Sequence, residues 1–280
     1  MSQAHKTAES AAETTARMES RIDVTLRDGV ALAFSDCHFD HRSPAPTAWR
    51  AAVMLARKLK PQLIVANGDV CDFPSISKHS RILWEERPKV VDEIAEAQTR
   101  LREIQIAAPK ARRVWNLGNH CLRLSSFLSN QAPQLEGLHG TCLEDFFPAW
   151  AFSWQVRVNS VSNSPAYIAH RLTGGTHAAY RNAVRAGATY VTGHTHSQKI
   201  IPVTSLRGTV WGVDCGCVAD VNSSLFTNYL EAGPTDWRSG FAVLTWASGE
   251  LLPPELVQVV TEHPEPGFGR IWWRGKLIAV

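Results

Sequence analysis

Three short apolar segments, separated by two segments with helical spacing, impose the strongest constraint on the fold of this chain. The apolar segments cover residues 30–34, 63–66 and 113–117, and the helical patterns cover 47–60 and 88–107. A proline follows each helical pattern and marks its end. Strands separated by helices can pair in parallel, because each helix returns the chain to the same end of the sheet. The sequence therefore predicts a parallel sheet in its first half.

Polar motifs follow these segments where each strand should end. Because the carboxyl ends of parallel strands meet at one edge of a sheet, we expect the motifs to converge on one cavity. In a strand, side chains alternate between the two faces, so we expect the first and third residues of D-x-H and H-x-H to point the same way. The motifs are Asp36-Cys37-His38, Gly68-Asp69-Val70-Cys71-Asp72, Gly118-Asn119-His120, an isolated His170 and Gly193-His194-Thr195-His196.

These motifs supply carboxylate, imidazole and amide groups. Such a mixed nitrogen and oxygen set suits manganese, iron, zinc or nickel, and the absence of paired thiolates argues against a structural zinc site. Seven candidate ligands are too many for one ion, so we expect two ions. His177 is an alternative to His170, which we prefer because it ends the apolar segment 166–169. The candidates are Asp36, His38, Asp69, Asn119, His170, His194 and His196.

The second half of the chain predicts strands with one helix over 175–187. A parallel half followed by a mixed half indicates two mixed β-sheets packed face to face with helices outside, a four-layer α/β/β/α sandwich. Residues 1–20 have few large apolar side chains and predict a disordered tail, so that 21–280 forms a single domain. The expected strands are 154–158, 166–169, 189–192, 210–213, 241–246 and 271–280.

Composition excludes several classes of protein. The formal net charge of +3 is too small for a protein that binds nucleic acid through its bulk charge. The chain has no apolar run of the ~20 residues that a membrane helix needs, so we expect no membrane partner. Six cysteines in a chain without a recognisable secretory leader, three of them within the motifs, predict a reducing, cytoplasmic setting.

The ordered series D-x-H, G-D-x-x-D, G-N-H, H and G-H-x-H resembles the calcineurin-like metallophosphoesterase superfamily over about residues 30–250. The resemblance implies two divalent ions, manganese first and iron, zinc, nickel or magnesium as alternatives. It implies that Asp36, His38 and His196 hold one ion, that Asn119, His170 and His194 hold the other, and that Asp69 bridges both. Three later segments, 174–178, 211–214 and 237–241, are similar to phage- and prophage-type members.

The resemblance also implies hydrolysis of a phosphate ester by a hydroxide that bridges the two ions. His120 would act as a general acid or orient the phosphate. The substrate we expect is a phosphodiester, either nucleic acid or a nucleotide. The alternatives are a phosphomonoesterase or phosphoprotein phosphatase, and a catalytically silent scaffold on the same fold.

One position departs from the superfamily pattern. Members usually carry Asp or Glu after G-N-H, where it orients the histidine, but this chain has Cys121. Asp72 or Asp40 could supply the missing carboxylate. The cysteines beside the motifs are interpreted as small residues that fill space. Candidate contacts for the substrate are Arg123, Arg171 and His177, and residues 73–90 are a candidate lid.

Overall fold

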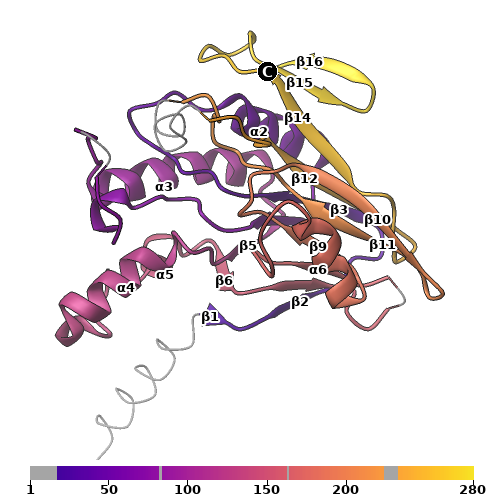
Figure 1. The fold of residues 1–280 in the computed structure, drawn as a ribbon, viewed down its shortest axis with the longest axis horizontal. Helices are drawn as coiled ribbons and strands as arrows, with labels where there is room; N and C mark the ends of the chain where they lie inside the picture. Colours follow the sequence, from indigo (N-terminus) through magenta and orange to yellow (C-terminus); the bar gives the residue numbers. More distant parts are fainter. Residues whose placement is uncertain (1–17, 82–83, 163, 224–232) are drawn as a thin grey trace, which may run out of the picture.

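Two β-sheets pack face to face, with helices on both outer faces, in a computed structural model of the chain (Figure 1). The structure describes residues 18–81, 84–162, 164–223 and 233–280. The predicted α/β/β/α sandwich of two mixed sheets is therefore confirmed. Most of the predicted tail, residues 1–17, lies outside the described residues, whereas Met18–Glu19 form a short strand.

The larger sheet contains the three strands expected from the first half of the sequence. Strands β1, β6, β5, β4 and β3 are parallel to their neighbours, and the strands from β12 onward pair antiparallel. In order, the sheet contains β1 (Met18–Glu19), β6 (Ala151–Ser153), β5 (Arg112–Asn116), β4 (Leu63–Ala66), β3 (Gly29–Phe34), β12 (Gly240–Ala247), β14 (Glu255–Thr261), β15 (Arg270–Trp273) and β16 (Lys276–Ala279), with β13 (Glu250–Leu251) paired to β12.

The smaller sheet is formed mainly from the second half of the chain. Strands β11, β9 and β8 are parallel, while β10 and β7 pair antiparallel with their neighbours β11 and β8. In order, the sheet contains β10 (Lys199–Ser205), β11 (Gly208–Asp214), β9 (Thr189–Thr192), β8 (Ala166–Ile168), β7 (Val156–Val158) and β2 (Ile22–Val24).

Alternating side chains of the central strands divide the interior into two cores. Leu32, Ile64 and Trp115 face the helices that cover the large sheet, whereas Ala33 and Val65 face the small sheet. Helix α6 covers the small sheet and contacts β9, β10 and β11. The helices are α2 (Thr47–Leu59), α3 (Val90–Ala107), α4 (Leu122–Gln131), α5 (Leu143–Phe146) and α6 (Ala178–Ala186), with 3-10 turns η1 (Pro74–Ile76) and η2 (Pro133–Leu135).

The structure corrects two of the expected strands. Residues 154–158 are not one strand: β6 ends at Ser153 in the large sheet and β7 begins at Val156 in the small sheet. Residues 271–280 form a hairpin, β15 and β16, because Arg274 and Gly275 adopt positive φ angles of 48° and 70° and turn the chain. Strands β10 and β14 and helix α4 were not expected from the sequence.

The chain crosses between the two sheets twice at the same edge of the sandwich. Strand β1 pairs with β6 in the large sheet, and β2 pairs with β7 in the small sheet, both in parallel. The connections at 20–21 and 154–155 therefore run side by side, and the backbone N–H of Ile22 donates to the carbonyl oxygen of Gln155 at 2.9 Å. This double crossing lies next to β5 in the large sheet and β8 in the small sheet, because β6 pairs with β5 and β7 pairs with β8. Figure 1 shows β1, β2 and β6 close together at this edge.

Candidate metal centre

All seven predicted metal ligands lie just beyond the ends of five strands. Strands β3, β4 and β5 of the large sheet and β8 and β9 of the small sheet deliver them. Backbone hydrogen bonds join the loops to one another: Asp36 N donates to Gly68 O at 3.0 Å, and Gly193 N donates to His170 O at 3.0 Å. Residues spread over 160 positions therefore meet at one edge of the sandwich.

Strand alternation is not the reason why these side chains share a cavity. The strands end before the candidate ligands, and the backbones of five of the seven turn into the left-handed region, which L-residues rarely adopt. Such strained residues are typical of functional sites, where the surrounding structure holds them. The ligands with positive φ are Asp36, His38, Asp69, His194 and His196.

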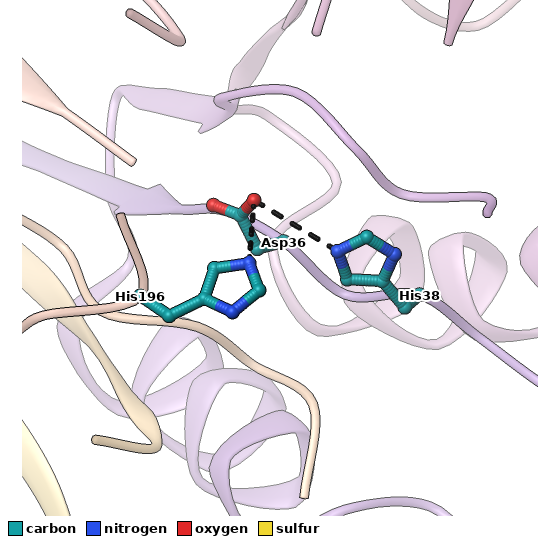
Figure 2. A group of neighbouring side chains, drawn as sticks. All are labelled: Asp36, His38 and His196. Carbon is teal, nitrogen blue, oxygen red and sulfur yellow. Dashed lines mark hydrogen bonds and ion pairs between the residues drawn. The ribbon is translucent and has the colours of Figure 1, made fainter. Parts of the chain in front are cut away.

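The first ligand group consists of Asp36, His38 and His196 (Figure 2). Both imidazole rings turn a nitrogen toward the same carboxylate oxygen: His196 Nε2 lies 3.1 Å and His38 Nε2 lies 3.9 Å from Asp36 Oδ1. The other oxygen, Asp36 Oδ2, accepts hydrogen bonds from the Ser35 hydroxyl at 2.5 Å and from His194 N at 2.8 Å. The buried carboxylate is thus oriented on one side and presents its free side to both histidines.

The second ligand group consists of Asp69, Asn119, His170 and His194. Asp69, His170 and His194 place ligand atoms within 4.8 Å of one another. His170 Nε2 lies 3.1 Å from Asp69 Oδ2 and 3.3 Å from Asn119 Oδ1. His170 is thus in the group, whereas the alternative His177 is exposed and precedes the first residue of α6.

Glycines in the motifs allow the ligand loops to approach one another. A Cβ atom on Gly118 would lie 2.1 Å from Asp69 Oδ1, and one on Gly193 would lie 1.9 Å from the Ser35 hydroxyl. A Cβ atom on Gly68 would lie 2.3 Å from His170 Nδ1, and Gly68 also has a φ of +93°. These positions require glycine because any side chain would occupy the space of a ligand.

Opposite charges dominate the electrostatics of both ligand groups. Burial by itself raises the pKa of Asp36, but the charges of His196 and His170 hold that pKa well below its ordinary value. Burial lowers the pKa of His38, but Asp36 and Asp72 raise it to about 10. Burial also lowers the pKa of His170, but the charges of Asp69 and Asp36 raise it to about 9. The carboxylates therefore favour positive charge at these positions.

The donor set and its surroundings fit divalent cations. Both groups combine carboxylate and imidazole, and the second adds an amide oxygen, a set suited to manganese, iron or zinc. His170 Nδ1 lies 2.8 Å from Asn67 O, so it donates to this carbonyl and leaves Nε2 facing the group. A bound cation would replace the protons that the histidines otherwise hold.

A further group joins His120 to Asp72 and Arg123. The carboxylate oxygen Asp72 Oδ1 contacts His120 Nδ1 and lies 3.3 Å from His38 Nδ1. Arg123 Nη1 donates to the Asp72 carbonyl oxygen at 2.6 Å and to Oδ1 at 3.2 Å. His120 N donates to Asp69 Oδ1 at 2.8 Å. Of the two alternatives, Asp72 orients His120, while Asp40 pairs with Arg42 instead.

Cys121 contacts a backbone group rather than the His120 ring. Its buried sulfur accepts hydrogen bonds from Asp69 N at 3.2 Å and from Trp115 Nε1 at 3.4 Å. Burial raises the pKa of the thiol to about 12, so the thiol is neutral. The six cysteines are all free thiols, and Cys121 supports the loop that carries Asp69.

Several residues that contribute to the site were not expected from the sequence. Ser35 orients Asp36, and Asn67 orients His170 through its backbone carbonyl. Glu93 of α3 accepts hydrogen bonds from Asp72 N at 3.2 Å and Phe73 N at 2.8 Å and so holds the loop that carries Asp72. Ser35 and Asn67 immediately precede motif residues, which is the one signal that could have identified them.

The predicted substrate contacts have different surroundings. Arg123 is engaged with Asp72, Arg171 is exposed and follows His170 directly, and His177 is exposed. In the candidate lid, Arg87 Nη1 donates to Pro74 O at 2.8 Å and Arg87 Nη2 to Ser80 O at 2.9 Å. Residues 82 and 83 of that segment lie outside the described residues.

No helix among the described residues is long and apolar enough to cross a membrane. The prediction of a cytoplasmic setting stays a prediction.

Two phage proteins are similar to this chain along most of its length. Gene 54 protein of Mycobacterium phage L5 is 26% identical over 261 residues, which cover 87% of this chain and 97% of the phage protein. Gene 54 protein of Mycobacterium phage D29 is 27% identical over 245 residues, covering 82% of this chain and 93% of the phage protein. No protein-family model matches the chain.

Solved structures resemble the chain at low sequence identity. Vps29 of Entamoeba histolytica, in complex with zinc, has a TM-score of 0.41 at 13% identity and covers 90% of this chain and 97% of its own. Vps29 of Chaetomium thermophilum has a TM-score of 0.43 at 9% identity, with coverages of 89% and 97%. A dimetal phosphatase from Danio rerio has a TM-score of 0.40 at 11% identity, with coverages of 83% and 96%. Because these TM-scores are low, we describe the fold of this chain from the order of the strands in its own two sheets.

Proposed function

We propose that this chain is a calcineurin-like metallophosphoesterase that binds two divalent ions. The first ion would be held by Asp36, His38 and His196, and the second by Asn119, His170 and His194, with Asp69 between them. One observation carries the proposal: motif residues from four strand ends form two groups of nitrogen and oxygen donors, and the ligand atoms of each group lie within 4.8 Å of one another. Manganese is the ion we propose for both sites.

The residues around the two groups have distinct roles in the proposed reaction. When bound, two such ions provide a nucleophile from water at neutral pH and stabilise charge on the phosphoryl oxygens. Asp72 engages His120 Nδ1, and the other ring nitrogen, His120 Nε2, lies 4.0 Å from Asp69 Oδ2 and 3.5 Å from Arg123 Nη2. From this position His120 donates a proton to the leaving oxygen, a contribution of about 10²- to 10⁴-fold. Cys121 does not weaken this role, because Asp72 provides the orienting carboxylate.

The proposed substrate is a phosphodiester of nucleic acid or a nucleotide. The two similar phage proteins agree with the likeness of three later segments to phage-type members. A phosphomonoesterase would share both ligand groups. The type of ester that is hydrolysed therefore distinguishes a phosphodiesterase from a phosphomonoesterase.

The test combines metal analysis with a panel of esters on one preparation. The chain is purified, stripped with EDTA and reloaded with manganese; we expect two ions per chain and faster turnover of bis-p-nitrophenyl phosphate than of p-nitrophenyl phosphate. Asp69→Ala should lose both metal and activity, whereas Glu250→Ala, an exposed carboxylate in β13, should change neither. Two bound ions without hydrolysis of any ester would favour a binding scaffold and overturn the enzyme.

A further inference from the structure

A cleft of about 300 Å³ opens beside the second ligand group. Asn119 and His170 form one wall, and the double crossing between the sheets contributes a second wall, with Arg21 and Trp154. Among the described residues that line the cleft, there is no Asp or Glu. The cleft is thus continuous with the candidate metal centre and carries positive charge at its rim.

The fold fixes the position of this second wall. Ile22 N donates to Gln155 O at 2.9 Å, and Leu117 N donates to Ser153 O at 2.9 Å, so both crossings are tied to the strand that ends before Asn119. Gln155 Nε2 also donates to the hydroxyl of Tyr190 at 3.2 Å. Because the chain is anchored in both sheets, the backbone at 21 and 154 keeps its place relative to the candidate ligands.

Three exposed side chains give the cleft its chemistry. Trp154 is 43% exposed although it lies at the edge of a well-packed sandwich. Arg21 and Arg171 are exposed, and neither makes a hydrogen bond or ion pair within residues 18–81, 84–162, 164–223 and 233–280. An aromatic side chain and two guanidinium groups that line the same cleft suit a planar ring that carries phosphate.

We infer that this cleft binds the nucleotide unit that adjoins the scissile phosphodiester, an inference that rests on the proposed function. The base stacks on Trp154, and the next phosphate along the strand contacts Arg21 and Arg171. The volume is at the lower end of pockets for small molecules, which suits one nucleotide rather than a duplex or a protein surface. The recognition is tolerant of sequence, because every base presents a π face.

The kinetic test compares three esters with the same leaving group. They are methyl p-nitrophenyl phosphate, thymidine 5′-(p-nitrophenyl phosphate), and the same thymidine ester with a 3′-phosphate. Wild type should hydrolyse them with increasing kcat/KM. Trp154→Ala should reduce the preference for thymidine over methyl about 5- to 150-fold, the range for base stacking, and Trp154→Phe should restore most of it. Arg21→Gln and Arg171→Gln should each remove about 10-fold of the advantage from the 3′-phosphate.

Matched controls lie outside the cleft. Trp272→Ala removes a tryptophan of β15 that is 50% exposed, and Arg207→Gln removes an exposed arginine at the turn between β10 and β11. Both should keep the wild-type preference among the three esters.

Binding without metal gives a second measurement. Fluorescence anisotropy of fluorescein-labelled hexathymidylate in EDTA should show weaker affinity for Trp154→Ala than for Trp272→Ala. Each arginine substitution should lower the slope of log affinity against log salt by about 0.7, the value for one phosphate of a single strand.

Different failures have different meanings. If wild type hydrolyses all three esters equally and binds no hexathymidylate, the cleft assignment is wrong while the phosphoesterase stands. If no ester is hydrolysed, the proposed function is wrong, and the anisotropy measurement alone then tests whether the cleft binds a nucleotide. If Trp154→Ala slows hydrolysis of a phosphoserine peptide but leaves the thymidine preference intact, the cleft binds protein and our inference is wrong.

Discussion

The orientation of His120 depends on a residue that is distant in sequence. In the superfamily pattern the next residue is acidic, but here Cys121 turns its sulfur to Asp69 N. Asp72, from the loop after β4, contacts His120 Nδ1 instead. A carboxylate that fixes one ring nitrogen decides which nitrogen faces the reacting group.

The first prediction concerns this carboxylate. Asp72→Asn should lower kcat for a phosphate ester by about 10- to 100-fold at saturating manganese, because residues that orient a site contribute at this level. Asp40→Asn provides the control, since Asp40 pairs with Arg42 and not with His120. Steady-state kinetics and metal analysis are measured on both variants. A wild-type kcat for Asp72→Asn would contradict the assigned role of Asp72.

Glycines in the loops after the strands determine how closely these loops pack against one another. Gly118 has an ordinary backbone angle, so the only reason for glycine there is space. Asp69 fills that space with Oδ1, which also accepts the hydrogen bond from His120 N. One loop thus depends on the other for the position of its ligand.

The second prediction follows from this contact. Gly118→Ala should displace Asp69 and reduce manganese content to one ion or none, with loss of activity. Gly174→Ala is the matched control, because no atom lies within 4 Å of a Cβ at that position. Metal analysis after gel filtration measures the result. If Gly118→Ala still bound two ions, the loops would be able to move apart and accommodate the extra Cβ atom, and the prediction would be wrong.

The sequence predicts the strands that are buried on both faces and misses several that are not. Strands β4 and β9 have every residue buried and match their predicted bounds. Strand β10 is half exposed and contains Pro202, so it has no continuous apolar run. The ligand candidates could be predicted because side-chain types in a fixed order identify them. The roles of Asn67 and Cys121 could not, because the Asn67 carbonyl oxygen contacts the His170 ring and the Cys121 sulfur contacts Asp69 N, and both partners are distant in sequence.

The break at Trp154 shows a further limit of sequence patterns. The pattern over 154–158 is typical of one strand, yet the chain passes from one sheet to the other before Val156. Side-chain alternation cannot reveal this crossing, because both sheets bury the same kinds of residue. The cleft beside the candidate metal centre could therefore not be predicted from the sequence.

At the scale of the whole molecule, buried acids make stability depend on pH. Burial raises the pKa of Glu93 to about 8, and among the described residues its Oε2 has no hydrogen-bond partner. Between its ordinary pKa and about 8, the unfolded chain has released this proton while the folded chain keeps it. The contribution of Glu93 to stability is therefore lost as pH rises through this range.

The third prediction tests this dependence. Glu93→Gln keeps the acceptor for Phe73 N but cannot ionise, so its unfolding free energy should fall less between pH 5.5 and pH 8.5 than that of wild type. Urea unfolding in EDTA at several pH values gives the comparison, with Glu250→Gln as an exposed control. Parallel curves for wild type and Glu93→Gln would show that Glu93 is already ionised in the folded chain.

The fourth prediction links metal to global stability. An ion that binds only the folded chain stabilises it by about 2.7 kcal/mol at 100 times its Kd, so manganese should raise Tm by several degrees. Asp69→Ala should lose this shift, whereas His120→Ala should keep it while turnover slows. Thermal melts with and without manganese measure both. An equal shift in Asp69→Ala would remove Asp69 from the ligands.

The segment from Met18 to Val24 has a consequence for how the chain can be altered. It donates one edge strand to each sheet and carries Arg21 between them. A truncation that removes the residues up to Val24 would expose a new edge strand in both sheets. It would also remove Arg21 from the lining of the cleft. Changes that are meant to leave the cleft intact therefore belong in the β15–β16 hairpin, which lies on the opposite border of the large sheet.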